Sequence, residues 1–348
     1  MRDGSEAGLT HPRYSRQVLF EGIKSEGQAN ISASRVAIVG CGALGAVQAS
    51  LLVRAGVGTL RIIDRDFVDE SNLQRQILFD EEDVRDLVPK AVAAERKLRL
   101  ANSLVHVEGI VEDVNPASID RLLGGFDLIM DASDNFDVRY LINDFSAKDR
   151  IPWIYGACVG SHGLTFPILP GDGPCLRCVF ETKPPAGVSL SCDTAGVIGP
   201  IVVLIAGMQV AEAMKLLSGA RGRVSRKITS IDVWENHSHA VNLPPRNPEC
   251  PCCARHEFPF LDGLFGADAT TLCGRNSVQI RRQEGTRVDL DALARRLGPI
   301  GRLEQNRFLL RASIDGYQMT VFSDGRAIIN GTYDLGVARS LYARYIGN

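Results

Sequence analysis

The stretch that decides the fold is RVAIVGCGALG, residues Arg35–Gly45, in which a short β-branched run leads straight into three closely spaced glycines. Residues 46–55 follow with a helical pattern, so the stretch predicts a strand, a glycine turn and a helix. Gly40, Gly42 and Gly45 would allow backbone amides and the positive end of the helix to approach a phosphate group. This unit is typical of nucleotide-binding α/β folds, although glycines also serve simply to pack a helix against a strand.

Strands and helices continue to alternate after this stretch. A second apolar strand, Thr59–Ile63, ends at Asp64, which lies 19 residues beyond Gly45. Nucleotide-binding α/β folds place an acid at this point to hold the ribose hydroxyls. The pattern predicts further strands at 105–111 and 127–131 and helices at 89–101 and 116–123. Such alternation indicates an α/β fold with a doubly wound, mostly parallel sheet of the Rossmann type.

Composition divides the chain into a large and a small domain. We expect the first domain over residues 1–262, ending where Pro259 and nearby glycines mark a loop. Residues 267–348 differ, because they hold twelve arginines, no lysine and eight acids, a local balance of +4. A helix at 288–297, a hairpin at 308–322 and a closing helix at 335–346 predict a small C-terminal α+β domain.

Charge and hydropathy exclude several classes of function. With 39 basic and 41 acidic residues in 348, the formal net charge is -2, so no global field attracts nucleic acid or a membrane surface. The charged N-terminal region shows no secretory signal, and we expect a cytoplasmic protein. The uncharged stretch 195–211 contains glycines and a proline and is short for a membrane span of about 20 residues, so it predicts a buried helix.

Four cysteines form two CxxC pairs that are far apart in the chain. Cys175 and Cys178 make the first pair, and Cys250 and Cys253 make the second, with 71 residues between the pairs. In a reducing compartment such thiols are better explained by metal than by disulfides, and four thiolates suit a tetrahedral structural zinc ion. Cys252 lies inside the second pair as an extra thiol.

The segment after the second strand helps to distinguish between nucleotides. The glycine turn alone fits NAD as well as ATP, but residues Asp64–Phe79 (DRDFVDESNLQRQILF) gather the acids, amides and guanidinium that a triphosphate with its metal requires. Its polar members include Asp64, Asp66, Asn72, Arg75 and Gln76. Singly, each would be read as part of a solvated loop. The full string resembles the signature of the ThiF, MoeB and HesA family of adenylating enzymes, relatives of ubiquitin-activating enzymes, and the resemblance extends from about Arg13 to Asp262.

The resemblance assigns roles to two cations. Arg13–Gln17 (RYSRQ) resembles the family's N-terminal RYxRQ segment, whose second arginine reaches the ATP of the partner subunit. By this likeness Arg16 acts in trans and the protein is a homodimer, whereas alone Arg16 would be read as an exposed side chain on a frayed terminus. Lys90, after Pro89, matches the family lysine that contacts the phosphates.

The end of the strand at 127–131 resembles the family's DxxDN element. The element and its continuation contain Asp131, Ser133, Asp134, Asn135, Arg139 and Asn143. The likeness implies that Asp134 holds magnesium and that the amide side chains, Asn135 among them, line the nucleotide pocket. Asp131 has a more ordinary alternative, which is to cap the following turn.

Two further cysteines have open roles. Cys192, in SCDTAGV at 191–197, resembles the family's crossover-loop cysteine, which in some members bonds to the carrier's C-terminus or handles persulfide sulfur. A small buried thiol is the ordinary alternative. Cys273 lies in the C-terminal domain, which is shorter than the rhodanese domain of some eukaryotic relatives, and a structural thiol is its default role.

The resemblance implies an adenylyltransferase that uses ATP and Mg²⁺ to activate the C-terminal Gly-Gly carboxylate of a ubiquitin-like sulfur-carrier protein, ThiS-like or MoaD-like, with release of pyrophosphate. Such a carboxylate is already a nucleophile, which explains why no His or Ser dyad stands out. Two alternatives remain. An NAD-dependent oxidoreductase would leave Arg16, Arg75 and Lys90 without roles, and a non-catalytic half of a heterodimer would be expected to have lost nucleotide-binding residues.

Overall fold

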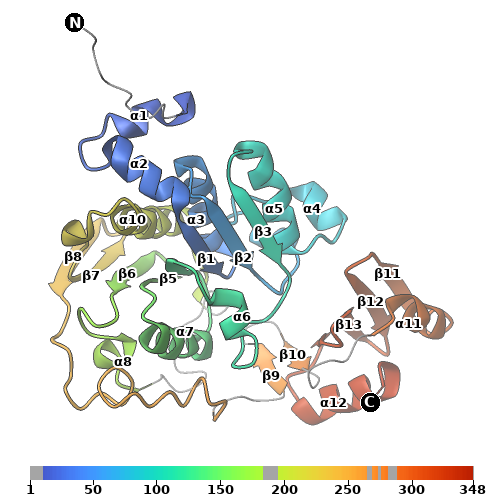
Figure 1. The fold of residues 1–348 in the computed structure, drawn as a ribbon. Helices are drawn as coiled ribbons and strands as arrows, with labels where there is room; N and C mark the ends of the chain where they lie inside the picture. The colour runs from blue at the N-terminus through green and yellow to red at the C-terminus, as the bar shows by residue number, and fades with distance from the viewer. Residues whose placement is uncertain (1–10, 183–194, 265–268, 273–275, 281–287, 348) are drawn as a thin grey trace, which may run out of the picture. The chain divides into compact units, whose positions relative to one another are not determined.

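A computed structural model describes residues 11–182, 195–264, 269–272, 276–280 and 288–347 of the chain (Figure 1). Contacts divide these residues into two compact units. The first unit comprises the described residues up to 182 together with 197–264, and the second comprises 195, 196 and the described residues from 269 onward. Each unit is built around one β-sheet.

The sheet of the first unit has eight strands in the order β3-β2-β1-β4-β5-β6-β7-β8. The parallel strands are β1 (Arg35–Val39), β2 (Thr59–Ile63), β3 (His106–Ile110), β4 (Leu128–Asp131) and β5 (Trp153–Val159). The strand order reverses between β1 and β4, and ligands of doubly wound folds bind at such a point, beyond the carboxyl ends of the strands. The predicted Rossmann-type α/β fold is confirmed.

Antiparallel strands continue this sheet beside β5. They are β6 (His162–Ile168), β7 (Lys227–Asp232) and β8 (His237–Asn242). The sequence analysis did not predict them. Both β5 and β6 contain glycine, and every residue of β8 is exposed, so no alternation of buried and exposed residues marks that strand.

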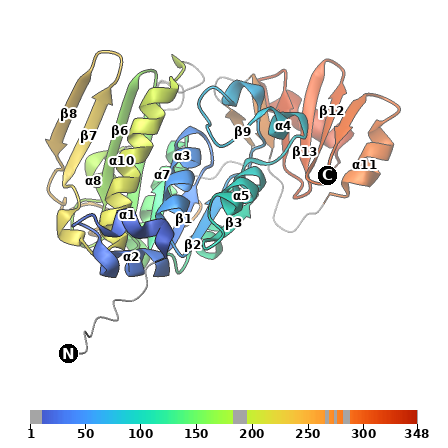
Figure 2. The same cartoon turned by 90° about the horizontal axis from the view of Figure 1, so that it is seen from above.

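Helices cover both faces of the parallel half of the sheet (Figure 2). One face carries α3 (Ala43–Ala55), α5 (Lys90–Ala101) and α10 (Gly199–Leu217), and the other carries α6 (Ile119–Leu123) and α7 (Phe136–Asp149). Within β1, Val36 and Ile38 belong to the core under the first group and Val39 to the core under the second. A strand that is buried on both faces reads as a continuous apolar run, which is why RVAIV predicted β1.

Helix α10 contains most of the uncharged stretch that was expected to form a buried helix. By length and composition alone, α10 is long and apolar enough to cross a membrane. In the structure it packs against α3, β5 and β6, and side chains such as Ile205 and Val210 are buried. Val203 and Leu204 are 45% and 42% exposed.

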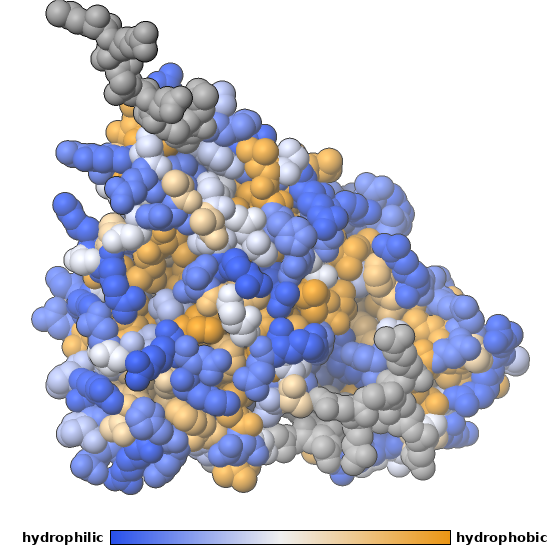
Figure 3. Space-filling model, viewed as in Figure 1, coloured by the Kyte–Doolittle hydropathy of each residue, from blue (hydrophilic) through white to orange (hydrophobic). Residues whose placement is uncertain are grey.

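On the face shown in Figure 3, hydrophilic side chains are interspersed with hydrophobic ones, as is normal for a folded protein.

Short helices complete the first unit. They are η1 (Pro12–Tyr14), α1 (Ser15–Val18), α2 (Lys24–Ala33), η2 (Glu70–Asn72), α4 (Glu81–Arg85), α8 (Leu176–Val179) and η3 (Arg221–Arg223). The η2 turn lies in the polar string that follows β2, and α4 begins with a capping box around Asp80.

The second unit is an antiparallel sheet in the order β11-β12-β13-β14-β10-β9. Its strands are β9 (Ala269–Leu272), β10 (Ser277–Ile280), β11 (Arg302–Gln305), β12 (Leu309–Ile314), β13 (Tyr317–Phe322) and β14 (Ala327–Asn330). Helices α11 (Leu290–Leu297) and α12 (Leu335–Tyr345) cover one face, where Leu310, Met319 and Ile329 contribute to the core. The predicted helices and hairpin are present.

Candidate active site

The glycine turn between β1 and α3 needs its glycines for two different reasons. Gly40 has φ +95° and lies so close to β4 that a Cβ would sit 2.6 Å from the carbonyl oxygen of Ala132. At Gly45 a Cβ would sit 2.1 Å from the Gly40 carbonyl oxygen. Around Gly42, the N-cap of α3, the nearest atom to such a Cβ is 3.8 Å away, so this part of the turn is open. The amides at the start of α3 can therefore receive an anion there.

Asp64, at the end of β2, organises the glycine turn. Its Oδ2 accepts the backbone N–H of Cys41 at 2.6 Å, and its Oδ1 accepts that of Asp66 at 2.7 Å. Burial raises the pKa of Asp64, and the neighbouring Lys90 acts in the opposite direction. Each carboxylate oxygen keeps a further lone pair, so the position remains compatible with a ribose hydroxyl.

Two cations lie among the acids beyond β2. Lys90, at the start of α5, is buried, and its Nζ is 3.5 Å from Oδ2 of Asp66. Arg65 Nη1 is 3.0 Å from Oδ1 of Asp113. Burial alone would lower the pKa of Arg65, but the charges of Asp113, Asp66 and Asp134 raise it. Sequence reasoning missed Arg65, although its position directly after Asp64 was a signal that it lies at this edge.

The polar string after β2 brings amides to the same edge of the sheet. Asn72 is buried in η2, and Arg75 Nη1 donates to the carbonyl of Ser71 at 2.8 Å. Gln76 is 4% exposed and its Oε1 has no hydrogen-bond partner among the described residues. Its amide is the group nearest to the open face of Gly42. A buried amide oxygen without a partner beside an open glycine turn fits a site that is completed by a ligand.

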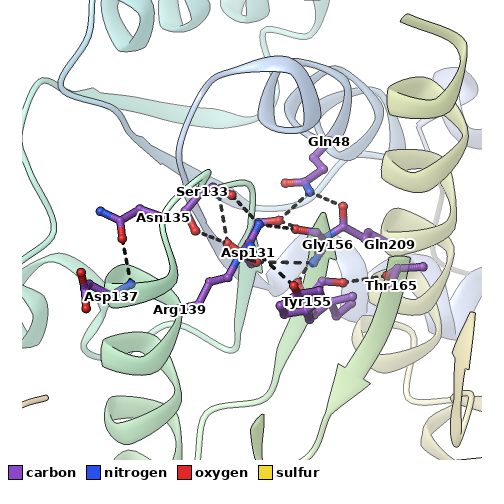
Figure 4. Close-up of polar contacts among 11 residues, drawn as sticks. Gln48, Asp131, Ser133, Asn135, Asp137, Arg139, Tyr155, Gly156, Thr165 and Gln209 are labelled. Atoms are coloured by element: carbon purple, nitrogen blue, oxygen red, sulfur yellow. Dashed lines mark hydrogen bonds and ion pairs between the residues drawn. The ribbon is translucent and has the colours of Figure 1, made fainter. Parts of the chain in front are cut away.

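The loop between β4 and α7 separates two aspartates with different surroundings, of which Figure 4 shows Asp131 with its partners Ser133 and Arg139. Asp131 is fully buried, accepts hydrogen bonds from Ser133 Oγ at 2.6 Å and Ser133 N–H at 3.0 Å, and pairs with Arg139 Nε at 3.0 Å. It therefore caps the turn, the ordinary alternative considered for it. Asp134 is exposed and free to bind a cation, with the charges of Arg65 and Arg139 nearby. Asn135 caps α7 by accepting the N–H of Asp137 at 2.8 Å.

Arg16 lies away from this edge within its own chain. Of its neighbours in sequence, Tyr14 packs on Gly56, and Gln17 Nε2 donates to the carbonyl of Ala55 at 2.9 Å. Both contacts lie at the C-terminal end of α3, whose 13 residues span about 20 Å from the glycine turn. An arginine side chain does not bridge that length, so the structure separates Arg16 from the other candidate residues. Cys192 lies outside the described residues, as does Cys273.

The four predicted zinc ligands come together in a second site of the first unit. The Sγ atoms of Cys175, Cys178, Cys250 and Cys253 all lie within 4.8 Å of one another. Adjacent sulfurs are 3.5 to 3.9 Å apart. Zn–S bonds of 2.3 Å in a tetrahedron place sulfurs about 3.8 Å apart, so the cluster has the right size and chemistry for zinc.

The extra thiol, Cys252, is buried beside the cluster, is not one of its four sulfurs, and contacts α7. Asn143 Nδ2 donates to Cys252 Sγ at 3.2 Å, and Asn143 Oδ1 accepts the N–H of Leu176 at 2.7 Å. Asn143 thus ties α7 to both halves of the cysteine site. The sequence analysis grouped Asn143 with the amides of the nucleotide pocket, and that assignment is wrong because the buried side chain makes its hydrogen bonds at the cysteine site.

We expect the Cys253→Ser variant to lose its zinc and to melt about 10 °C or more below the parent protein, because structural zinc contributes directly to the free energy of folding. The Cys252→Ser variant makes the same change one residue earlier and should keep the metal. Metal analysis and thermal unfolding of the two variants measure this. Equal zinc content in both would show that Cys253 is not a ligand.

Comparison with known proteins identifies relatives over most of the chain. The ThiF family model matches residues 14–252. The sulfur carrier protein ThiS adenylyltransferase of Bacillus subtilis (strain 168) is 45% identical over 337 residues, covering 96% of this chain and 99% of the relative. The sulfur carrier protein adenylyltransferase of Thermus thermophilus is 37% identical over 246 residues, covering 69% of this chain and 90% of the relative. The B. subtilis match therefore continues through the C-terminal unit, whereas the sequence analysis had ended the resemblance at about Asp262.

Solved structures share the fold over 71% of this chain or a similar part of it. The crystal structure of E. coli MccB with MccA-N7isoASN has a TM-score of 0.63 and 23% identity, over 71% of this chain and 76% of that one. This likeness concerns the fold alone. The match of the family model over residues 14–252, together with 45% identity to a relative of nearly the same length, shows that the chain belongs to the ThiF family.

Proposed function

We propose that this protein is an ATP-dependent adenylyltransferase that activates the C-terminal Gly-Gly carboxylate of a small ubiquitin-like sulfur-carrier protein and releases pyrophosphate. The observation that carries the proposal is the edge of the sheet at β1, β2 and β4. There an open glycine turn, a buried lysine and an exposed aspartate lie at one edge of the sheet, in a chain 45% identical to a named ThiS adenylyltransferase.

The residues divide the work of holding ATP. The amides around Gly42 receive the phosphates, with Lys90 and Arg75 offsetting their charge. Asp64 takes the ribose, and Asn72 and Gln76 close the pocket with Asp66 and Asn135 beside it. The exposed Asp134 would hold Mg²⁺, and the cation would offset the negative charge that gathers on the leaving pyrophosphate.

Little acid–base chemistry is needed for the transfer itself. A carboxylate oxygen of the carrier forms a bond to the α-phosphorus, the bond from that phosphorus to the bridging oxygen breaks, and pyrophosphate leaves. The nucleophile enters already ionised, so the protein contributes position and charge rather than a general base. Cys41 in the glycine turn takes no part, because burial and the neighbouring Asp64 raise the pKa of its thiol.

The active species in this proposal is a homodimer in which each site receives Arg16 from the other chain. Support comes from the distance between Arg16 and the glycine turn of its own chain, and from apolar side chains exposed nearby. Leu19 and Phe20 are 73% and 65% exposed, and Leu51 on α3 is exposed beside the packed helix α10. Surfaces of this kind are typical of subunit interfaces.

The cysteines have separate roles in this proposal. The zinc site joins two distant segments and is structural, while the Cys192 thiol would bond to the carrier's C-terminal carbonyl to form a thioester, losing its proton as the bond to AMP breaks and AMP leaves. A reducing, cytoplasmic location suits a protein that depends on free thiols.

We expect ATP–pyrophosphate exchange that requires both Mg²⁺ and a carrier ending in Gly-Gly. The reason is that the reverse reaction needs the acyl adenylate, which forms only when the carboxylate reaches the site. Exchange of labelled pyrophosphate into ATP measures it, with a panel of ThiS-like and MoaD-like carriers. A carrier that lacks the last glycine serves as the control and should be inactive. Tight NAD binding without exchange for any carrier would instead favour an oxidoreductase.

A further inference from the structure

Strands β4 and β5 separate just where the proposed magnesium loop begins. They pair only at Ile129 with Trp153 and at Met130 with Ile154, although β5 continues to Val159. Beyond this point a side chain, rather than backbone hydrogen bonds between the two strands, connects β4 to β5. Gln209 Nε2, from α10, donates to the carbonyl of Asp131 at 2.9 Å and to that of Ile154 at 3.2 Å.

A second glutamine reaches the same carbonyl from the other helix. Gln48 Nε2, from α3, donates to the Asp131 carbonyl at 3.1 Å and to Gln209 Oε1 at 2.7 Å. Both glutamines are completely buried. Burying amides in an apolar core is costly unless they are hydrogen-bonded, and the Nε2 groups of both glutamines make such bonds, whereas Gln48 Oε1 has no partner among the described residues. The Gln209 side chain fits here only because residue 156 is glycine, since a Cβ at that position would sit 2.3 Å from the Gln209 amide.

Arg139 binds the side chain of Asp131, whose backbone carbonyl accepts from the two glutamines (Figure 4). Besides its ion pair with the Asp131 carboxylate, its Nη2 donates to the carbonyls of Ser133 at 2.7 Å and Gly156 at 3.0 Å. The backbone of Asp131 is thus fixed by two glutamines and its carboxylate by an arginine. Asp134 follows three residues later and is itself exposed.

We propose that Gln48 and Gln209 are positioning residues for adenylyl transfer, which fix the loop that carries Asp134 relative to the glycine turn. This inference rests on the proposed function. Gln48 belongs to α3, whose first turn is the phosphate-binding end, so one helix sets both the phosphates and the start of the magnesium loop. Gln209 belongs to α10, so a shift of that helix would also move the hydrogen-bond donor to the Asp131 carbonyl.

The Gln209→Leu variant tests this, because leucine has a similar size but removes one of the two glutamine donors to the Asp131 carbonyl and the side-chain donor to the Ile154 carbonyl. We expect the Mg²⁺ concentration for half-maximal ATP–pyrophosphate exchange to rise about 10-fold and kcat to fall by a similar factor, since small misplacements of reacting groups cost rate steeply. The KM for the carrier should stay unchanged. Adding Gln48→Leu removes the remaining glutamine donor to the Asp131 carbonyl, so the effects of the two substitutions should not be additive, because both side chains act through one carbonyl.

The matched control is Thr165→Val, which also removes a buried side-chain donor from a β5 carbonyl, that of Tyr155, at 2.8 Å. It should reproduce any general loss of stability without the change in Mg²⁺ dependence. Hydrogen exchange supplies a readout that does not depend on activity. The amides of Ala132 and Ser133 should exchange faster in Gln209→Leu than in Thr165→Val.

The outcomes separate this inference from the proposed function. If the parent protein exchanges pyrophosphate but Gln209→Leu keeps the parent Mg²⁺ dependence and the parent exchange of the loop amides, the positioning role is refuted and the adenylation stands. If the parent protein shows no exchange with any carrier, the proposed function fails. Faster exchange of the loop amides in Gln209→Leu would then still support the glutamines as the fixing points of the loop.

Discussion

Replacing Asp134 by alanine is expected to lower Mg²⁺-dependent ATP–pyrophosphate exchange about 100- to 1000-fold, the usual effect of removing one well-placed charged group from an active site. The carboxylate is exposed, and the described residues show no hydrogen bond or ion pair to it. Its removal should therefore cost little stability, because exposed side chains outside structural networks contribute little to folding. Thermal unfolding close to that of the parent protein, with exchange lost, is the expected pair of results.

Asp149→Ala is the matched control for this variant. Asp149 is exposed at the C-terminal end of α7, whereas Asp134 lies just before its start, about 21 Å away along the 14 residues of the helix. The same loss of one negative charge is then made far from the glycine turn, and exchange should remain. If Asp134→Ala keeps full activity, Mg²⁺ is held elsewhere, and the acids around Arg65 are the next candidates.

Local patterns allowed the parallel half of the fold to be predicted. Both β1 and β2 were predicted to the residue, because largely buried strands are dominated by apolar residues, although β2 includes the half-buried Arg61. The antiparallel half lacks that signal, as β8 is exposed along its whole length. Helix α7 was also missed. Its buried face carries Arg139, Asn143 and Asp144, which form hydrogen bonds inside the protein. These polar residues interrupt the apolar periodicity that predicts an amphipathic helix.

The site divides in a similar way between local and distant contributions. Gly40, Gly42, Asp64 and Lys90 could be placed from motif spacing because each lies at the end of a strand or the start of a helix near β1. Gln48 and Gln209 could not, since they meet across 161 residues of sequence. The only signal was an uncharged polar residue inside the apolar helix α10, and such a residue acquires meaning only when its partners are known.

The zinc site shows the limit of spacing more sharply. The string CPCC at 250–253 offers three thiols, and counting alone does not exclude Cys252. The turn that contains them directs Cys252 to Asn143 and the flanking pair to Cys175 and Cys178. Ligand choice is thus decided by which side of a tight turn faces α7. The two serine variants that distinguish Cys252 from Cys253 test that geometry.

Mixing two inactive variants is expected to restore activity if the sites are shared between subunits. Arg16→Ala and Asp134→Ala each damage every site of their own homodimer. In a mixed dimer one site has native Asp134 and receives native Arg16 from the other chain, while the second site has both defects. Random exchange at equal amounts makes about half of the dimers mixed, so about a quarter of the parent exchange activity should return.

The Arg13→Ala variant controls for damage to the N-terminal segment. Arg13 lies three residues before Arg16 and is likewise exposed, but its Nη1 is occupied with the carbonyl of Ala101 at 2.7 Å. It should stay active alone and need no complementation. Subunit exchange is followed independently by mass labels on one variant. With exchange established, activity that fails to return would place Arg16 within its own chain, against the span of about 20 Å that α3 puts between its anchoring contacts and the glycine turn.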